Sequence, residues 1–447
     1  MTVDSFIRAT LDRAQAAGIT AAEIYLSSRD SFRAMCQQGV INNYTVNATR
    51  GLSLRGLYNG KMGYAATEAI DEDAVEQLVR GVIESAELTE DTDVQEIYPG
   101  DQEYPQVDNY APALDQVDEQ RKLQFVLDMD KLAKEKDPRI VALAYNMVST
   151  NSGSVRIVNS FGLDLSHKDN GAVAVVEAVA KEGDRVATGT GFKSTRDFDE
   201  MDADRLVSEA VEDALFMLKA EPVKSGAYRA IIHAKCMPDL LGTFAGVFSA
   251  EAAQKGMSLL AGKEGQDIAS PAVTLMDDPL LKGGLASAPF DDEGVAASTK
   301  PVIEKGKLTT LLHNLKTAKK AGVKTTGNAS RPGYAGTVGV APSNFYFAPG
   351  EKSLEQLMAD MGDGIVITEV SGLHSGANMI SGDFSLIAQG YTVKNGKKDA
   401  PVDRITVAGN FYQLLKNIRA VGSDLTFPGS PLGSPSVDVG EISVAGK

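Results

Sequence analysis

A glycine- and serine-rich loop contains the residues of this sequence that are best suited to chemistry. The loop extends from residue 371 to residue 383 and contains His374, Ser375 and, at its end, Asp383. An imidazole can act as a general base for a hydroxyl, and functional residues concentrate in loops. No G-x-S-x-G elbow or Walker loop accompanies them. We therefore regard these three residues as candidates for contact with a substrate, and a serine hydrolase stays an alternative only through His374.

Residues that could bind a metal are sparse and widely separated. The four histidines are His167, His233, His313 and His374, and no two of them have the spacing of a helical ligand pair. His233 and His313 fall in predicted strands, so we expect them to be core or edge residues. The carboxylate run Asp291–Glu293 is expected to form a solvated turn, with a structural cation as the alternative.

The two cysteines give no sign of a disulfide framework. Cys36 and Cys236 each lie in an apolar run, and cysteine is among the most buried residue types, so we expect two buried free thiols. The first 15 residues form an amphipathic, partly acidic pattern rather than a signal peptide. No apolar run is long enough to span a membrane. The sequence thus predicts a cytoplasmic protein without a membrane segment.

The overall charge of the chain is strongly negative. Its 447 residues include 44 Lys and Arg against 60 Asp and Glu, which gives a net charge of −16. Binding to nucleic acid requires a cationic surface that displaces the phosphate counterions, so we expect no nucleic-acid partner. The length allows two or three domains with cores of their own.

The elements that must position the loop predict an α+β protein in four parts. We expect an N-terminal α+β unit at residues 1–88, an acidic linker at 89–114, a middle α+β meander at 115–222 and a C-terminal domain at 223–447. Helices with mixed or antiparallel sheets make up the N-terminal parts. The C-terminal domain is expected to be β-rich, with a barrel-like antiparallel sheet.

Several individual elements can be placed by pattern. Short strands are expected at 23–27, 32–36 and 51–57, and one continuous helix at about 239–253. Residues 87–119 contain many acidic residues, three prolines and no Lys or Arg, which predicts an extended connector.

Two strands and a helix are expected to frame the glycine-rich loop. Apolar runs at 365–370 and 384–393 predict the strands, and Asn395-Gly396 predicts a type I′ hairpin turn, which needs positive φ at both residues. The returning strand at 402–407 leads to Asn410, whose side chain can cap the helix that follows.

Four motifs in this region carry a resemblance to a known family. They are Gly-Asp-Phe-Ser at 382–385, Val-Lys-Asn-Gly-Lys at 393–397, Pro-Val-Asp-Arg-Ile-Thr-Val-Ala-Gly-Asn at 401–410 and Val-Gly-Ser-Asp-Leu at 421–425. Their order and content resemble the C-terminal part of the TldD/PmbA family, whose members were once called modulators of DNA gyrase. The resemblance covers nearly the whole chain and is strongest after Pro222.

The resemblance implies where a catalytic metal would be held. TldD-type members carry H-E-x-x-x-H on the helix after the strand that matches residues 228–234, and a cysteine near the C-terminus completes the ligands of a zinc-like ion. In this sequence Gly242 and Thr243 align with the first His and the Glu, Val247 with the second His and Leu432 with the cysteine. None of these side chains can bind a metal or act as a base. The family's spacing also implies that the helix must distort or end between the two His positions.

This departure matches the PmbA, or TldE, branch of the family. It implies a chain without catalytic residues and without a metal of its own, acting as a subunit of a cytosolic metallopeptidase that processes peptides or unfolded proteins. His374, Ser375 and Asp383 are then the candidates for contact with the peptide. A TldD-like subunit would hold the zinc-like metal, and pairing with a second copy of the chain is the other option for a partner. Two alternatives stay open: an autonomous peptidase that uses His374 and Asp383, and a regulatory protein that binds another protein such as gyrase.

Overall fold

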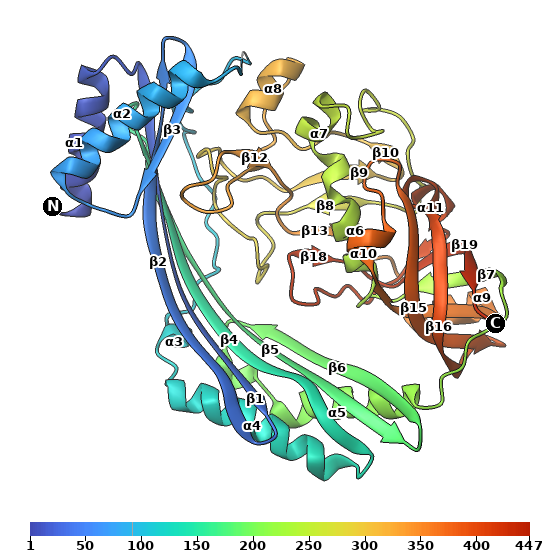
Figure 1. Ribbon diagram of the computed structural model, residues 1–447. Coiled ribbons are helices and arrows are strands. Elements are labelled where there is room, and N and C mark those ends of the chain that lie inside the picture. Colours follow the sequence, from blue (N-terminus) through green and yellow to red (C-terminus); the bar gives the residue numbers. More distant parts are fainter. Residues whose placement is uncertain (92) are drawn as a thin grey trace.

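A computed structural model describes residues 1–91 and 93–447 of the chain. Its N-terminal part forms one long, curved sheet of six antiparallel strands in the order β3-β2-β1-β4-β5-β6 (Figure 1). The strands are β1 Ala21–Gln37, β2 Val40–Tyr58, β3 Lys61–Thr67, β4 Ile140–Asn159, β5 Asp164–Glu182 and β6 Arg185–Thr195. The short strands predicted at 23–27 and 32–36 are two parts of β1, and the one at 51–57 is part of β2, so their predicted lengths were wrong.

Four helices cover the convex side of this sheet (Figure 1). They are α1 Val3–Ala16, α2 Glu72–Leu88, α4 Glu119–Lys136 and α5 Ala203–Met217. Each begins after a residue whose side chain accepts a backbone N–H of the first turn, which lowers the cost of starting the helix; these residues are Thr2, Asp71, Asp118 and Asp202. Helices α1 and α2 share one core with the sheet, and α4 and α5 share another. None of the helices in the described ranges is long and apolar enough to cross a membrane.

Alternate residues of the long strands face these helices. In β1, Phe32, Ala34 and Cys36 are buried in the core beneath α4, whereas Arg33 between them is exposed. This period of two follows from the pleat of the strand, in which successive side chains point to opposite faces. Cys36 and Cys236 are both buried and free, which confirms the prediction for the thiols.

The C-terminal part contains a closed barrel of five strands. The ring consists of β7 Gly226–Ile232, β14 Gly364–Ser371, β15 Asp383–Lys394, β16 Lys397–Asn410 and β19 Val437–Ala445. It closes because β16 pairs with β19 as well as with β15. The pairing of β7 with β14 is parallel, and the other pairings of the ring are antiparallel. This architecture confirms the predicted α+β class with a barrel-like C-terminal region.

Local chemistry at the barrel matches the sequence closely. Asn395 and Gly396 form the predicted turn between β15 and β16, with φ values of 49° and 75°. The side chain of Asn410 accepts the backbone N–H of Gln413 at 3.2 Å and so caps the helix as predicted.

Smaller elements pack around the barrel. The remaining strands are β8 Leu275–Asp277, β9 Lys300–Glu304, β10 Lys307–Leu308, β11 Ala329–Ser330, β12 Gly339–Val340, β13 Phe345–Phe347, β17 Ala420–Val421 and β18 Leu432–Gly433. The remaining helical segments are α3 Pro112–Asp115, η1 Phe198–Glu200, α6 Met237–Phe244, η2 Ala245–Phe248, α7 Ala250–Gln254, α8 Leu315–Ala321, α9 Leu354–Met361, α10 Leu373–Gly376 and α11 Phe411–Asn417. The single helix predicted at 239–253 was therefore wrong. Its α-helical turns stop at Phe244, and Ser249 caps the new helix α7.

A buried ionic network joins the N-terminal sheet to the C-terminal part. Arg55 of β2 donates two hydrogen bonds to Glu23 of β1, at 2.8 and 2.9 Å, and one to Glu293, at 2.9 Å. Arg331 also donates to Glu23. Burial alone would raise the pKa of Glu23, but the two guanidinium groups outweigh it, so the pKa of Glu23 is lowered. All four side chains are at most 4% exposed, so the two parts of the molecule share charges that water does not screen.

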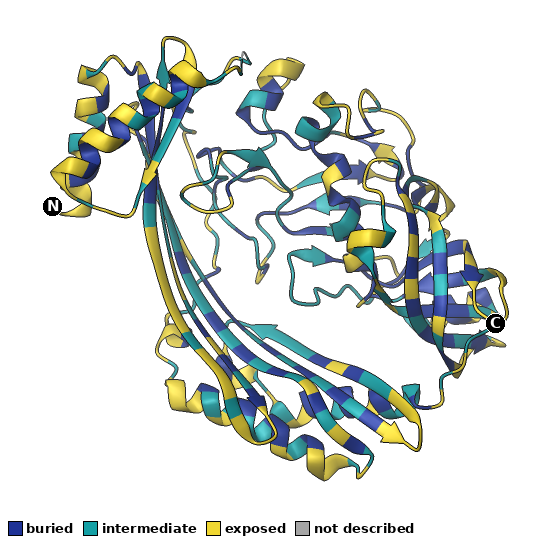
Figure 2. Ribbon diagram, in the orientation of Figure 1, coloured by how far each residue is buried: buried dark blue, intermediate teal, exposed yellow. Residues whose placement is uncertain are grey.

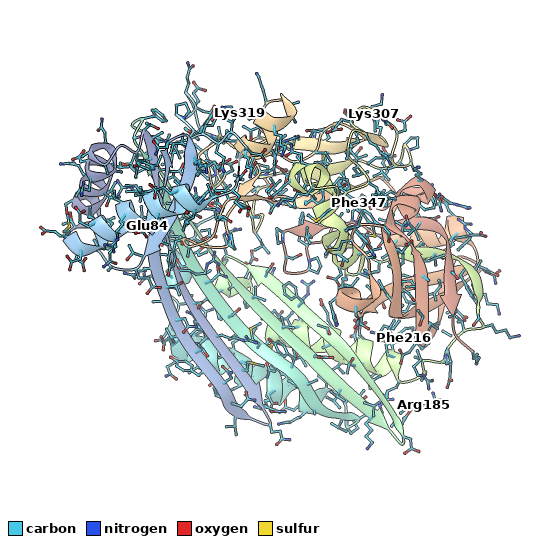
Figure 3. The ribbon with its side chains drawn as sticks, turned by 45° about the horizontal axis from the view of Figure 1, so that its top comes forward. Glu84, Arg185, Phe216, Lys307, Lys319 and Phe347 are labelled. Atoms are coloured by element: carbon cyan, nitrogen blue, oxygen red, sulfur yellow. The ribbon has the colours of Figure 1, made fainter. Side chains whose placement is uncertain are left out.

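Two further contacts join the parts. The acidic linker runs beside α8, and Figure 3 shows Lys319 on this helix. The lysines Lys316, Lys319 and Lys320 pair with Asp91, Glu96 and Asp93 at 2.5, 2.6 and 2.9 Å, respectively. Toward the far end of the sheet, Phe216 of α5 packs against Tyr391 of the barrel, with ring centroids 6.4 Å apart (Figure 3). Ion pairs thus hold the linker, and helix α5, which covers the sheet, contacts the barrel near the far end of the sheet.

The buried network predicts a large difference between two arginines with the same bidentate geometry. Arg55→Met leaves Glu23 and Glu293 short of a buried partner, and we expect it to lower the free energy of unfolding by about 3–5 kcal/mol. Arg13 pairs with Glu76 in a similar way, but both side chains are well exposed, so Arg13→Met should leave stability unchanged. Urea unfolding followed by circular dichroism measures both. Equal urea midpoints for the two variants would contradict the role of burial.

Candidate functional site

Three segments that are distant in sequence meet beside the barrel. Helix α6 follows β7 through a short turn and contacts both β18 and α10. Strand β18 runs parallel to β13, with Leu432 opposite Phe345. Helix α10 is the glycine-rich loop that sequence analysis singled out. The structure therefore brings three segments together: the glycine-rich loop, helix α6 with Gly242 and Thr243, and strand β18 with Leu432.

Gly242 and Leu432 are in direct contact. A methyl group added to the Cα atom of Gly242 would lie 2.5 Å from Cδ1 of Leu432, closer than real Cβ contacts come. The lack of a side chain at 242 is therefore what makes room for the leucine. The two positions that the sequence analysis assigned to the first His and the Cys of the metal-bearing branch therefore adjoin each other in space, and an apolar contact fills the space between them.

The other two aligned positions point elsewhere. The Thr243 hydroxyl donates to the backbone carbonyl of Asp239 at 2.9 Å, so it is occupied within its own helix. Val247 is 2% exposed and belongs to the core around the barrel. It lies in the 3₁₀ segment η2, and the α-helix does end between positions 242 and 247, as the spacing of the motif implied. None of the four side chains offers a group for a zinc-like ion, so the residues present do not fit that metal.

The candidates of the glycine-rich loop lie at the surface. His374 and Ser375 are exposed on α10, and the Ser375 hydroxyl donates to the carbonyl of Gly372 at 3.3 Å. Asp383 accepts hydrogen bonds from Ser381 and Asn410, both at 2.8 Å, and these lower its pKa. Among the described residues no hydrogen bond links His374 to Asp383 or to a serine hydroxyl. The loop presents an accessible imidazole, and its contact with a peptide stays a prediction.

The carboxylate run is structural. Asp291 accepts backbone N–H groups of Glu293, Val295 and Ala329, and Glu293 is one of the buried partners of Arg55. The expected solvated turn was therefore wrong, because its charges are used inside the protein. Within residues 1–91 and 93–447, no group of three or more His, Cys, Asp and Glu side chains is arranged to hold a metal ion.

The remaining histidines do not form a site either. Both histidines were expected in strands, and that expectation was wrong. His313 is buried and precedes α8, and His233 is half-buried at the turn after β7. The Nδ1 atom of His233 accepts the N–H of Lys235 at 3.1 Å, which stabilises the turn into α6. The ring of His167 packs edge-on against Phe290, with centroids 5.3 Å apart.

Sequence reasoning missed an acidic rim next to α6. The surrounding protein partly desolvates Asp239, an exposed residue in the first turn of α6, and this raises its pKa. Desolvation and then the charge of Glu177 raise the pKa of Glu369, an exposed residue of β14. Glu177 comes from β5 of the N-terminal sheet, so the two parts of the molecule face each other here. No motif predicts this grouping, because the three carboxylates come from strands and helices that only the tertiary fold brings together.

Comparison with known families matches most of the chain in three consecutive pieces. Residues 22–86 match domain 1 of the PmbA/TldA metallopeptidases, residues 112–218 the central domain and residues 225–446 the C-terminal domain. The C-terminal match contains α6, α10 and β18, and thus the whole candidate site.

Individual relatives match nearly the full length of the chain. A crystal structure from Thermotoga maritima MSB8, described as a putative modulator of a DNA gyrase, is 32% identical, has a TM-score of 0.93 and is matched over 99% of this chain and 100% of its own. The metalloprotease PmbA of Escherichia coli O157:H7 is 25% identical over 95% of this chain and 92% of its own length. The structure of TldE from Thermococcus kodakarensis has the same fold, with a TM-score of 0.89, 22% identity and coverage of 99% of this chain and 100% of its own.

The contact between Gly242 and Leu432 predicts that substitutions at the two positions are coupled. Gly242→Ala alone should change stability little, because the gain of about 1 kcal/mol in helix propensity is offset by an off-rotamer Leu432. In a Leu432→Ala background the added methyl meets free space, so the same change should stabilise by about 1 kcal/mol. Urea unfolding of the wild type, both single variants and the double variant measures this coupling. Additive effects would show that the two side chains do not compete for space.

Proposed function

This chain belongs to the PmbA/TldD metallopeptidase family, and from that premise we propose that it is a subunit that does not itself hold the catalytic metal. In this proposal a related, TldD-like chain carries the zinc-like ion and the general base. The present chain completes the assembly that processes peptides or unfolded proteins in the cytoplasm. No step of the metal chemistry is assigned to its own residues.

One observation carries the proposal: the apolar contact of Gly242 with Leu432 at the aligned ligand positions. A site that had only lost its metal would retain at least one imidazole or thiolate, because each ligand is a separate residue. Here both meeting positions lack a donor atom, and Val247 is part of the core. Replacement of the whole donor set by well-packed apolar atoms is what a structural, rather than catalytic, helix requires.

The exposed loop supports a role for this chain toward the peptide. His374 and Ser375 lie next to α6 on a surface that a partner or an extended peptide can reach. Asp239 of α6 and Glu369 of β14 lie near each other, and the negative charge of Asp239 contributes to the raised pKa of Glu369. We propose that these residues contribute contacts to a peptide that is cleaved on the partner subunit.

The proposal predicts the metal content and activity of the purified full-length chain. After zinc loading and desalting, elemental mass spectrometry should find near-zero zinc in this chain and about one zinc per chain in a TldD-like relative treated in parallel. The chain alone should not cleave an unfolded peptide, and addition of the TldD-like relative should produce cleavage that a chelator abolishes.

Two results would overturn the proposal. Stoichiometric zinc on this chain would mean that ligands other than the aligned residues exist. Chelator-sensitive cleavage by the chain alone would make it an autonomous peptidase. The activity would have to appear in two independent preparations and disappear when an antibody removes the chain.

A further inference from the structure

Three Asn-Gly pairs occur in the chain, and they lie in different surroundings. They are Asn59-Gly60 in the turn between β2 and β3, Asn170-Gly171 within β5, and Asn395-Gly396 in the turn between β15 and β16. An asparagine before a glycine is chemically labile, because glycine has no side chain to keep its backbone nitrogen away from the asparagine amide. The surroundings of each pair therefore decide which of them is free to react.

The two turns have almost the same backbone. The φ angle is 50° at Asn59 and 76° at Gly60, against 49° at Asn395 and 75° at Gly396. A lysine follows the glycine in both turns. Among the described residues, no hydrogen bond holds the side-chain amide of Asn59 or of Asn395. Neither the local sequence nor the turn geometry distinguishes the two pairs.

The surroundings hold the turn at Gly396 in place. Its N–H donates to the carbonyl of Gly362 at 2.7 Å, and the N–H of Asn395 donates to Asp363 at 2.7 Å. A methyl group on the Cα atom of Gly396 would lie 2.8 Å from the Cα atom of Ala359 in α9. The nitrogen of Gly396 therefore cannot move without breaking a hydrogen bond and disturbing packed backbone.

The turn at Gly60 is open. Both of its central residues are exposed, at the end of the sheet that carries α1 and α2 (Figure 2). In the described part of the chain, the N–H of Gly60 has no acceptor, and a methyl group added to its Cα atom would meet nothing within 4 Å. This nitrogen is free to approach the side chain of Asn59.

The third pair is locked by its asparagine. Asn170 is 3% exposed, and its side chain donates to the carbonyl of Ala111 at 2.7 Å and to Asp115 at 3.0 Å. The same side chain accepts the N–H of Ala111 at 2.9 Å. It cannot turn toward the nitrogen of Gly171 while these three bonds hold.

We infer that Asn59 is a site of spontaneous deamidation, and that the fold protects Asn170 and Asn395 from the same reaction. The backbone nitrogen of Gly60 attacks Cγ of Asn59 and forms a succinimide ring. The bond from Cγ to the side-chain nitrogen breaks, and that nitrogen leaves as ammonia after it takes up, through water, the proton that Gly60 lost. One water molecule then opens the ring at either carbonyl and leaves aspartate or isoaspartate at position 59.

The product alters the hairpin that joins β2 to β3. It adds one negative charge to a chain whose net charge is already −16. Isoaspartate also adds one backbone atom to a two-residue turn, and the length of this turn sets Tyr58 opposite Lys61. We expect the hairpin to loosen as the protein ages. The turn belongs neither to α6 nor to β18, so the inference does not depend on the proposed function.

The first test is the rate of deamidation at each asparagine in the folded, full-length chain. Peptide mapping by mass spectrometry after incubation at mildly alkaline pH detects the replacement of the amide NH₂ by OH. We expect Asn59 to react at least about tenfold faster than Asn395 and Asn170, because the two protected sites must first break hydrogen bonds. In guanidinium chloride the three rates should be similar, since glycine follows each asparagine. Equal rates at Asn59 and Asn395 in the folded chain would overturn the inference.

The second test removes the reactive amide but retains the turn. Asn59→Gly leaves a Gly-Gly pair, which a type I′ turn accepts, and Asn395→Gly is the matched control. Isoelectric focusing should show acidic forms of Asn59→Gly accumulating at no more than about a third of the wild-type rate. The control variant should match the wild type. Accumulation in Asn59→Gly at the wild-type rate would place the reactive asparagine elsewhere and contradict the assignment.

Discussion

The buried pairing of Arg55 with Glu23 and Glu293 is the interaction on which the arrangement of the two parts depends. A guanidinium without contact to water costs several kcal/mol unless carboxylates surround it. Glu23 lies on the neighbouring strand, but Glu293 belongs to the C-terminal part. The sheet therefore cannot swing away from the barrel without leaving buried charges unpaired. This requirement fixes one end of the long sheet.

The shape of the sheet follows from this anchor and from the contacts at its other end. Strands of up to 20 residues are longer than most, and they curve around the C-terminal part with helices on their outer face (Figure 1). Because β3 has only 7 residues, it covers the anchored half of β2 and leaves the other half open. The free edge is thus a consequence of unequal strand lengths within a sheet that is tethered at its ends.

The sequence predicts those features that depend on local chemistry. The turn at Asn395 and Gly396 and the cap at Asn410 were both recognised, because each needs only the residues beside it. The lengths of β1 and β2 were not, since the polar residues 27–31 interrupt the apolar pattern of β1, and residues 40–50 of β2 are mostly exposed and lack the alternation of a half-buried strand. The burial of Glu293 was missed for a related reason. Its partner Arg55 is 238 residues away in the sequence, and no local pattern predicts that the two residues pair.

The candidate site shows the same division. The alignment of four residues identified the positions, but only the fold shows that Gly242 and Leu432 touch. Physical chemistry explains why such a site would change as a unit. Gly242 and Leu432 are half-buried, so a lone imidazole or thiolate there would lose part of its contact with water without a metal to bind, at a cost below the about 1–3 kcal/mol of a fully buried unpaired polar group. Replacement of the donors by glycine and leucine removes that cost and adds an apolar contact. In a chain that holds no metal at these positions, stability therefore favours glycine and leucine over ligands that would have no partner.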